Sequence, residues 1–180
     1  MTETFADFHF QPFLMEALKD LHFVKPTPVQ EKVIPIVLAN KSVVGQSQTG
    51  SGKTHAFLLP IFEQLDAQNQ NVQVVITTPS RELAYQIYNA AKQLNRFAPQ
   101  KFTIHNYVGG TDKQHQIDQL QRKQPQLVIG TPGRILDLIN SQALDIHTAH
   151  RFVVDEADMT LDMGFLEQVD GIASHFPEDL

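Results

Sequence analysis

Short apolar runs rich in β-branched residues recur along this chain of 180 residues. Each run is a few residues long and is followed by glycine, proline or other turn-forming residues, which is the pattern of strands buried on both faces. These runs predict strands at residues 42–44, 72–76, 102–108, 127–129 and 152–154.

Between these runs, apolar residues repeat at three- and four-residue steps, as they do on one face of a helix. Ser80 is a suitable N-cap for one helix, and Pro132 suits the first turn of another. The repeats predict helices at residues 55–65, 81–95, 111–121, 132–140 and 165–176. Alternating strands and helices predict an α/β domain, with a mostly parallel sheet and helices on both of its faces.

The strongest chemical signal is the segment at residues 47–54, Ser-Gln-Thr-Gly-Ser-Gly-Lys-Thr. It lies between a predicted strand and a predicted helix, where a glycine-rich loop ending in Gly-Lys-Thr holds nucleotide phosphates. Lys53 would reach the β- and γ-phosphates, and the Thr54 hydroxyl would bind Mg²⁺. The usual pattern has glycine in place of Ser47, and a flexible loop with a solvated lysine is the alternative interpretation.

A second signal is the acidic segment Asp-Glu-Ala-Asp at residues 155–158, which follows a predicted strand. Ligands of parallel sheets bind at the carboxyl ends of the strands, so these carboxylates are expected near the phosphates. Asp155 would hold Mg²⁺, largely through water, opposite Thr54, and Glu156 would polarise the attacking water or accept its proton. Adjacent carboxylates in an apolar setting need a compensating cation, and a solvated acidic turn is the alternative.

Composition narrows the classes of function. The formal net charge is −6, so contact with nucleic acid must come from local donors rather than from an overall positive field. The chain has no cysteine, which excludes disulfides and cysteine-bound zinc. No apolar run approaches the ~20 residues of a membrane span, and the first residues lack signal-peptide features, so we expect a cytoplasmic protein. The histidine spacing predicts no metal site, since His147 and His150 lie near a predicted turn.

Taken together, the motifs resemble the first RecA-like domain of DEAD-box ATP-dependent RNA helicases, and a compact bacterial member in particular. The resemblance covers essentially the whole chain, and the motifs follow the family's order. Residues 79–86, Pro-Ser-Arg-Glu-Leu-Ala-Tyr-Gln, resemble the family's Pro-Thr-Arg-Glu-Leu-Ala motif. Gly109-Gly110 matches its glycine doublet, and Thr-Pro-Gly-Arg at residues 131–134 matches its next RNA-contacting motif. The resemblance implies a RecA-like P-loop fold.

Residues 23–30, Phe-Val-Lys-Pro-Thr-Pro-Val-Gln, resemble the family's adenine-reading motif. The Gln30 amide contains a donor and an acceptor, so it can pair with adenine N6 and N7 together. Thr27 and Gln30 also have the spacing of a helix capping box, and this alternative stays open. His22 stands where the family usually has glycine, which puts the backbone conformation before Phe23 in question.

The resemblance implies ATP and Mg²⁺ as cofactors. The nucleotide-binding residues that it implies are Phe5, Phe23, Lys25, Gln30, Ser47, Gln48, Thr49, Gly50, Ser51, Gly52, Lys53 and Thr54. The catalytic residues that it implies are Lys53, Thr54, Asp155, Glu156 and Asp158, of which Thr54 and Asp155 would hold the metal. Asp158 would couple the site to the family's Ser-Ala-Thr strand or to its second RecA-like domain.

The resemblance also implies contacts to the backbone of one RNA strand. The implied residues are Pro79, Arg81, Gly109, Gly110, Thr131, Pro132, Gly133 and Arg134. Glycines let main-chain N–H groups come close to phosphates, and helix starts supply more donors. Such contacts read shape and the 2′-OH rather than base sequence. For Arg81 and Arg134, pairing with a carboxylate is the alternative.

The resemblance divides the domain into adenine-recognition helices at residues 1–40 and a RecA-like body at residues 41–180. The family's Ser-Ala-Thr strand, which sits between the phosphate-loop strand and the Asp-Glu strand, would lie beyond Leu180, as would the second RecA-like domain with its arginine finger. We therefore expect a truncated product that lacks its last strand or strands. It would expose strand edges and apolar faces, bind ATP weakly and hydrolyse almost none.

The predicted function is that of an ATP-dependent RNA helicase, which couples ATP binding and hydrolysis to local unwinding of an RNA duplex. The expected partners are RNA and the second RecA-like domain, with no membrane and with the oligomeric state left open. A catalytically inert ATP- and RNA-binding module is one alternative. A different P-loop ATPase, such as a transporter or a DNA motor, is another, but it would lack the adenine-reading motif and the series from Arg81 to Arg134.

Overall fold

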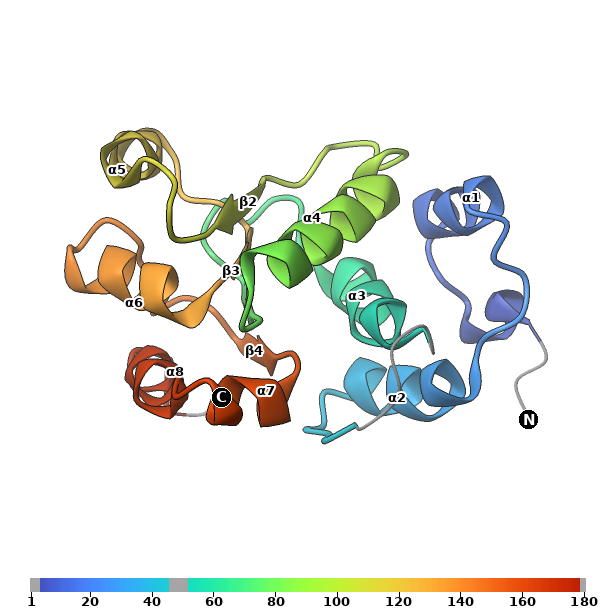
Figure 1. Ribbon diagram of the computed structural model, residues 1–180. Coiled ribbons are helices and arrows are strands. Elements are labelled where there is room, and N and C mark those ends of the chain that lie inside the picture. Colours follow the sequence, from blue (N-terminus) through green and yellow to red (C-terminus); the bar gives the residue numbers. More distant parts are fainter. Residues whose placement is uncertain (1–3, 46–51, 179–180) are drawn as a thin grey trace. The chain divides into compact units, whose positions relative to one another are not determined.

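The computed structural model describes residues 4–45 and 52–178 (Figure 1). It divides into two compact units. The first contains residues Met1–Ala67 and Ala90–Lys101, and the second contains residues Gln68–Asn89 and Phe102–Leu180. The expected division of the chain at residue 40 stays a prediction.

The described elements of the first unit include η1 (Phe5–Phe8), α1 (Pro12–Asp20), α2 (Pro28–Leu38) and α3 (Lys53–Gln64). Helices α2 and α3 pack against each other. Apolar side chains from these helices are almost completely buried; examples are Leu14, Leu18, Ile34, Leu58 and Phe62. At the start of α1, the Gln11 backbone N–H donates to the Glu63 carboxylate and the Gln11 amide donates to the Glu63 carbonyl, which attaches α1 to the end of α3.

The predicted strand at residues 42–44 is not formed. Residues 41–45 have no regular secondary structure in the described part of the chain, and Val44 is 94% exposed. Strand residues need a neighbouring strand to satisfy their backbone N–H and C=O groups, and none of the described strands pairs with this segment. The apolar character of the run was therefore not sufficient to predict a strand.

The second unit contains a parallel sheet whose order is β2-β3-β1-β4. Its strands are β1 (Val74–Thr77), β2 (Ile104–Tyr107), β3 (Leu127–Gly130) and β4 (Arg151–Val154). Strands β1 and β3 lie in the centre of the sheet, and every one of their residues is buried. Strand β4 lies at an edge and is only partly buried along its length, which fits its place at the end of the order.

The strand order determines where the connecting helices lie. The chain runs from β1 to β2 in one direction across the sheet, and then from β2 to β3 and from β3 to β4 in the other. Because such crossovers are right-handed, α4 lies on one face, and α5 and α6 lie on the other. The bounds of these helices are Arg81–Asn95, Lys113–Arg122 and Pro132–Asn140. Residues 81–89 of α4 belong to this unit.

The face of the sheet that carries α5 and α6 has a continuous apolar core. Val75, Tyr107 and Val128 of the strands pack there with side chains such as Leu120 of α5 and Leu138 of α6. The elements α7 (Ala157–Asp162) and α8 (Leu166–Ala173) complete the unit, and α8 packs against α6. Predicted helix 132–140 and predicted helix 81–95 are confirmed at these bounds, and the predicted parallel sheet is confirmed as well.

Candidate functional site

The start of helix α3 is shaped by Gly52, which precedes Lys53 and Thr54. Gly52 is the N-cap residue and has a φ of 86°, a left-handed conformation that suits glycine. A Cβ atom on Gly52 would lie 2.5 Å from Gln30 Nε2 and 2.9 Å from Thr27 Oγ1, so a side chain here would displace both of these side-chain ends. Glycine has no side chain that could cap α3, and the N–H groups of the first helical turn are donors suited to an anion.

Gln30 holds this glycine in place and at the same time caps its own helix. Its Nε2 donates to the Gly52 carbonyl at 3.1 Å, and its Oε1 accepts from the Thr27 N–H at 2.9 Å. The Gln30 N–H in turn donates to Thr27 Oγ1, so the capping box that the sequence permitted is formed. Gln30 is only 3% exposed. We call Thr27, Gln30 and Gly52 the α3 corner.

Phe23 and His22 lie just before this corner in the sequence. His22 has a φ of 59°, so the chain takes a left-handed conformation here with a histidine. Such a conformation costs a residue with a Cβ atom on the order of 1 kcal/mol more than it costs glycine. Phe23 is 36% exposed, and its ring meets the His55 ring edge-on with centroids 5.0 Å apart.

Burial lowers the pKa of His55 below its ordinary value, and its Nε2 is buried without a hydrogen-bond partner in the described part of the chain.

Two other predicted nucleotide residues differ in exposure. Lys25 is exposed, whereas Phe5 is 2% exposed and its N–H donates to the Val24 carbonyl. Through that bond, η1 supports the backbone next to Phe23. The predicted loop residues Ser47, Gln48, Thr49, Gly50 and Ser51 lie outside the described residues.

In the second unit, the acidic motif begins where β4 ends. Asp155 is 7% exposed, its N–H donates to the Thr77 carbonyl at 2.8 Å, and one carboxylate oxygen accepts a bond of 3.2 Å from Thr78 Oγ1. Glu156 is the N-cap of α7 and has a left-handed backbone, with φ 54° and ψ 55°. Strained residues of this kind collect at functional sites. Asp158 lies in the first turn of α7 and is exposed.

The Asp155 carboxylate is chemically suited to the expected Mg²⁺. Mg²⁺ prefers oxygen ligands and keeps several water molecules, so a single buried carboxylate is a suitable protein ligand for it. Among residues 4–45 and 52–178, no group of three or more His, Cys, Asp or Glu side chains is gathered for a metal. A metal held there would therefore depend on water and on nucleotide phosphates.

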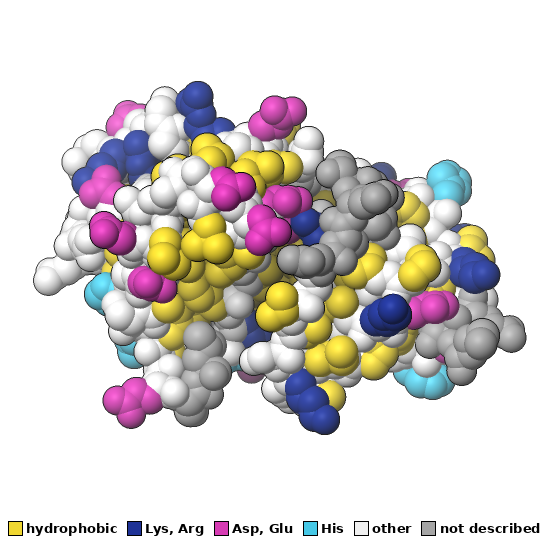
Figure 2. All heavy atoms as spheres, turned by 60° about the horizontal axis from the view of Figure 1, so that its bottom comes forward, with side chains coloured by type: hydrophobic (Ala, Val, Ile, Leu, Met, Phe, Trp, Pro, Cys, Tyr) yellow, Lys and Arg dark blue, Asp and Glu magenta, His cyan; other side chains and the backbone are white. Residues whose placement is uncertain are grey.

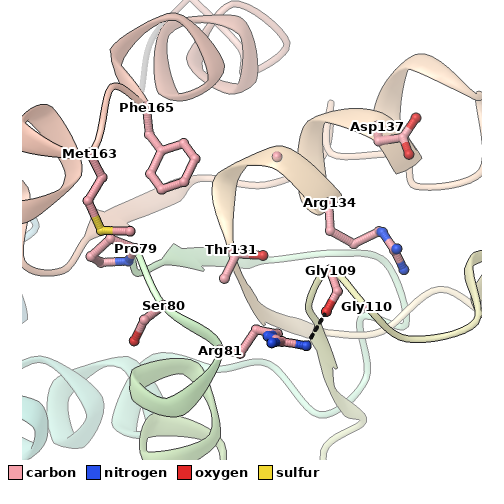
Figure 3. Close-up of a pocket in the computed structure, with 11 residues that line it drawn as sticks. Pro79, Ser80, Arg81, Gly109, Gly110, Thr131, Arg134, Asp137, Met163 and Phe165 are labelled. Atoms are coloured by element: carbon pink, nitrogen blue, oxygen red, sulfur yellow. Dashed lines mark hydrogen bonds between the residues drawn. The ribbon is translucent and has the colours of Figure 1, made fainter.

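A groove of the second unit lies at the carboxyl edge of its sheet. Neighbouring strands β1 and β3 lead into α4 and α6, which lie on opposite faces, and such a switch point leaves a crevice where ligands of α/β sheets bind. The groove found there has a volume of about 690 Å³ (Figure 3). The turns after β1, β2 and β3 all contribute to its walls.

Most of the predicted RNA-contacting residues line this groove. They are Pro79, Arg81, Gly109, Gly110, Thr131, Gly133 and Arg134. Pro132 does not line it and is buried in the first turn of α6.

Both arginines of the groove donate hydrogen bonds to the loop that contains Gly109 and Gly110. Arg81 Nη1 donates to the Gly109 carbonyl at 3.4 Å, and Arg134 Nη1 donates to the Thr111 carbonyl at 3.1 Å (Figure 3 draws the first bond). Neither arginine has a carboxylate partner in the described part of the chain.

Comparison with known proteins decides the family. The family model for the DEAD/DEAH box helicases matches residues 27–180. This chain belongs to that family.

Curated DEAD-box relatives are much longer than this chain. The DEAD-box ATP-dependent RNA helicase CshB of Listeria monocytogenes is 53% identical over 98% of this chain and 40% of the relative. CshB of Bacillus subtilis is 52% identical over 100% of this chain and 41% of the relative. The chain thus spans about 40% of the length of these relatives.

Solved DEAD-box structures confirm the predicted RecA-like fold. A DEAD box protein from the hyperthermophile Methanococcus jannaschii has a TM-score of 0.91 and 36% identity, covering 98% of this chain and 47% of that chain. A variant of Dbp5 from S. cerevisiae, bound to RNA and ADP BeF3, has a TM-score of 0.86 and 30% identity, covering 98% and 44%.

The groove of the second unit is also lined by residues that the sequence did not predict as part of a site. They are Ser80, Asp137, Met163 and Phe165. The Phe165 ring points into the groove from above Thr131, with Met163 beside it (Figure 3). Met163 and Phe165 lie five and seven residues after the acidic motif. The apolar pattern predicted a helix face for Phe165 and no role for Met163. Their position shortly after the acidic motif was the one signal in the sequence that could have placed them near a site.

Apolar side chains are exposed on α7 and on the segment that joins it to α8. Met159, Leu161, Met163 and Leu166 are each 40–52% exposed. Figure 2, which brings the bottom of Figure 1 forward, shows hydrophobic side chains at the surface among acidic ones. Strand β4 lies at an edge of the described sheet, and these apolar side chains lie at the surface. No described helix has the length and apolar character needed to cross a bilayer.

Proposed function

We propose that this chain is the ATP- and RNA-binding part of an ATP-dependent RNA helicase. The observation that carries the proposal is the groove, because it gathers two arginines, a glycine doublet and a helix start at a switch point of the sheet. Such a set of donors suits a phosphate backbone. The relatives named above are ATP-dependent RNA helicases by name, and we extend that activity, including duplex unwinding, to this protein as a proposal. A cytoplasmic location is part of the same proposal.

The α3 corner would bind the adenine nucleotide. The Gln30 amide oxygen has two lone pairs and its nitrogen has two hydrogens, so each atom has one site left after the bonds to Thr27 and Gly52. The second lone pair can accept from adenine N6, and the second hydrogen can donate to N7. Capping and adenine recognition are therefore compatible, provided that the base reaches this buried side chain. Phe23 and Lys25 would line the approach, and the buried Phe5 would support the backbone next to Phe23.

The phosphates would be bound at the start of α3 by Gly52 and by residues of the loop that precedes it. Lys53 would contact the β- and γ-phosphates, and Thr54 and Asp155 would hold Mg²⁺, which neutralises charge that develops on the phosphoryl group. Glu156 would orient the attacking water, and Asp158 would link the site to neighbouring parts of the protein.

The RNA backbone would lie in the groove. Arg81 and Arg134 would attract phosphates, while the turns around Gly110 and Thr131 would bring main-chain donors close. Because these groups do not reach base edges, binding would be insensitive to sequence and sensitive to the 2′-OH.

A binding experiment tests this proposal. We expect labelled single-stranded RNA to bind the chain more tightly than DNA of the same sequence, as measured by fluorescence anisotropy. Arg81→Gln and Arg134→Gln should each weaken RNA binding and reduce its salt dependence by about 0.7 in the logarithmic slope. Arg122→Gln, an exposed arginine on α5 that does not line the groove, is the matched control. The proposal would be contradicted if the unsubstituted chain bound RNA and DNA equally, and if the Arg81 and Arg134 variants bound RNA as tightly as it does.

A catalytically inert binding module is the second candidate, in which the groove and the α3 corner bind RNA and ATP without turnover. An arginine finger accelerates related phosphoryl transfers by about 10³–10⁵-fold, and the family supplies it from the second RecA-like domain. We therefore expect the 180-residue chain to bind ATP with little turnover. RNA-stimulated hydrolysis at the rate of a full-length relative would exclude this candidate.

A further inference from the structure

Gln116 connects two of the groove's loops, although nothing in its sequence context marks it as functional. It lies on α5 and is 7% exposed. Its Oε1 accepts a bond of 2.8 Å from Arg134 Nη1, and its Nε2 donates a bond of 2.8 Å to Thr111 Oγ1. The Thr111 hydroxyl donates in turn to the Val108 carbonyl at 2.6 Å. One buried amide therefore joins the start of α6 to the loop that carries Gly109 and Gly110.

These bonds use only one end of the arginine. In the described structure, the bonds of Arg134 to Gln116 and Thr111 all come from Nη1. A guanidinium has five N–H donors, so the three on Nε and Nη2 are left for a ligand. Holding Nη1 fixes the plane of the group and hence the direction in which those three donors point.

The Gln116 amide that holds Arg134 is neutral, and this property matters most for binding a phosphate. A carboxylate at position 116 would orient the guanidinium as well, but it would also cancel the charge that attracts a phosphate. The nearest acidic side chain of α6, Asp137, instead pairs with Lys113 at 2.8 Å. Gln116 thus orients the arginine and leaves its full positive charge.

We propose that Gln116 is a positioning residue for RNA binding, which aims the free edge of Arg134 at a phosphate in the groove. The proposal rests on the proposed function, since it assumes that RNA lies in the groove. It goes further by assigning a role to a residue outside the groove lining and by explaining why that residue is an amide.

The experiment measures RNA affinity of the 180-residue chain over a range of salt concentrations. Gln116→Met keeps the approximate size of the side chain and removes both bonds. We expect it to weaken binding of single-stranded RNA by on the order of 3- to 10-fold and to reduce the salt slope by about 0.7, as expected for one lost phosphate contact. In an Arg134→Gln background, the same substitution should have no further effect.

Gln116→Glu separates positioning from a merely structural role. Glutamate keeps the acceptor for Arg134 and loses only the donor to Thr111, so the melting temperature should fall less than in Gln116→Met. RNA affinity should nevertheless fall, because the new charge neutralises the arginine. If Gln116 only held the loops together, Gln116→Glu would bind RNA as tightly as the unsubstituted chain does. This result would overturn the proposal.

A buried glutamine elsewhere in the same unit supplies the matched control. Gln126 is 2% exposed, its Nε2 donates to the Asn69 carbonyl and its Oε1 accepts from the Thr103 N–H. Gln126→Met should lower stability and leave the RNA affinity of the folded chain unchanged. An equal loss of affinity in Gln126→Met, or a Gln116→Met effect that persists with Arg134→Gln, would refute the positioning role. If the unsubstituted chain does not bind RNA, the proposed function itself fails, and this inference fails with it.

Discussion

The α3 corner of the first unit and the groove of the second both depend on a glycine, but for different reasons. Gly52 takes a left-handed φ of 86° beside two side chains. Gly130 takes an ordinary strand conformation, but a Cβ atom on it would lie 2.1 Å from the Tyr107 carbonyl oxygen of β2. The corner therefore depends on a left-handed backbone beside side-chain ends that can move, whereas the groove depends on the close approach of two strand backbones, which cannot move independently.

This difference predicts unequal sensitivity to the same substitution. Gly130→Ala places a methyl group against the backbone of β2, which cannot move without disturbing the sheet. We expect a loss of about 3 kcal/mol in the free energy of unfolding, measured by chemical denaturation. Gly133→Ala is the control, since nothing lies within 4 Å of its Cβ position. Similar stabilities of the two variants would show that β2 and β3 are not held as closely as described.

Gly52→Ala should have a smaller effect, about 2 kcal/mol, because the obstructing atoms are side-chain ends that can move. Its cost combines backbone strain with the displacement of Gln30 and Thr27. Gly164→Ala isolates the strain, since Gly164 has a φ of 80° and open space around its Cβ position. We expect Gly52→Ala to be the more destabilising of the two and to weaken ATP binding. An equal loss of stability in both would mean that the contacts with Gln30 contribute nothing.

A third substitution separates the two roles of Gln30. Gln30→Glu keeps the acceptor of the capping box but removes the donor for Gly52 and for adenine N7. We expect ATP affinity to fall by about 10-fold while α2 stays capped, as measured by titration with a fluorescent ATP analogue. Gln64→Glu is the matched control, because the Gln64 amide also donates to a carbonyl, that of Leu38, away from the corner. If ATP affinity is unchanged in Gln30→Glu, the capping box is the only role of Gln30.

The smallest expected effect concerns pH. Burial lowers the pKa of His55 in the first unit, and of His105 and His150 in the second, below the ordinary value of 6.5, with smaller contributions from Lys123 and Arg151 to the last two. The unfolded chain therefore binds protons at a pH where the folded chain does not, so stability is present above pH 6.5 and falls as the pH decreases below it.

Urea denaturation at several pH values between 5 and 7.5 measures this dependence. His105→Gln should make this dependence of stability on pH shallower, because it removes one of the buried histidines. A stability that rises on acidification would contradict the assignment of these lowered pKa values.

The sequence predicted helix caps well, because the residues of a cap are neighbours along the chain. Ser80 was predicted to cap α4, and its hydroxyl accepts from the Leu83 N–H at 3.1 Å. The capping box of Thr27 and Gln30 is also formed from residues three apart. Both involve neighbours along the chain, so spacing alone carries the information.

Features that depend on strand order could not be predicted in the same way. Residues 42–44 have the composition of a strand, but composition does not reveal whether a partner strand is present. The roles of Phe165 and Gln116 depend on which loops the sheet brings together, and the order β2-β3-β1-β4 cannot be inferred from spacing. An apolar side chain after an acidic motif and a glutamine on a polar helix carry no distinctive signal of their own.

The left-handed backbone at Glu156 has a practical consequence for trapping experiments. A substitution meant to arrest hydrolysis at this position alters backbone preference as well as chemistry, since glycine would relax the φ of 54° and valine would oppose it. A glycine variant could thus be more thermostable and inactive together, and its stability would be mistaken for ligand-induced protection. Glu156→Gln keeps the length and the backbone preference of the side chain, so it is the cleaner choice for capturing a bound nucleotide.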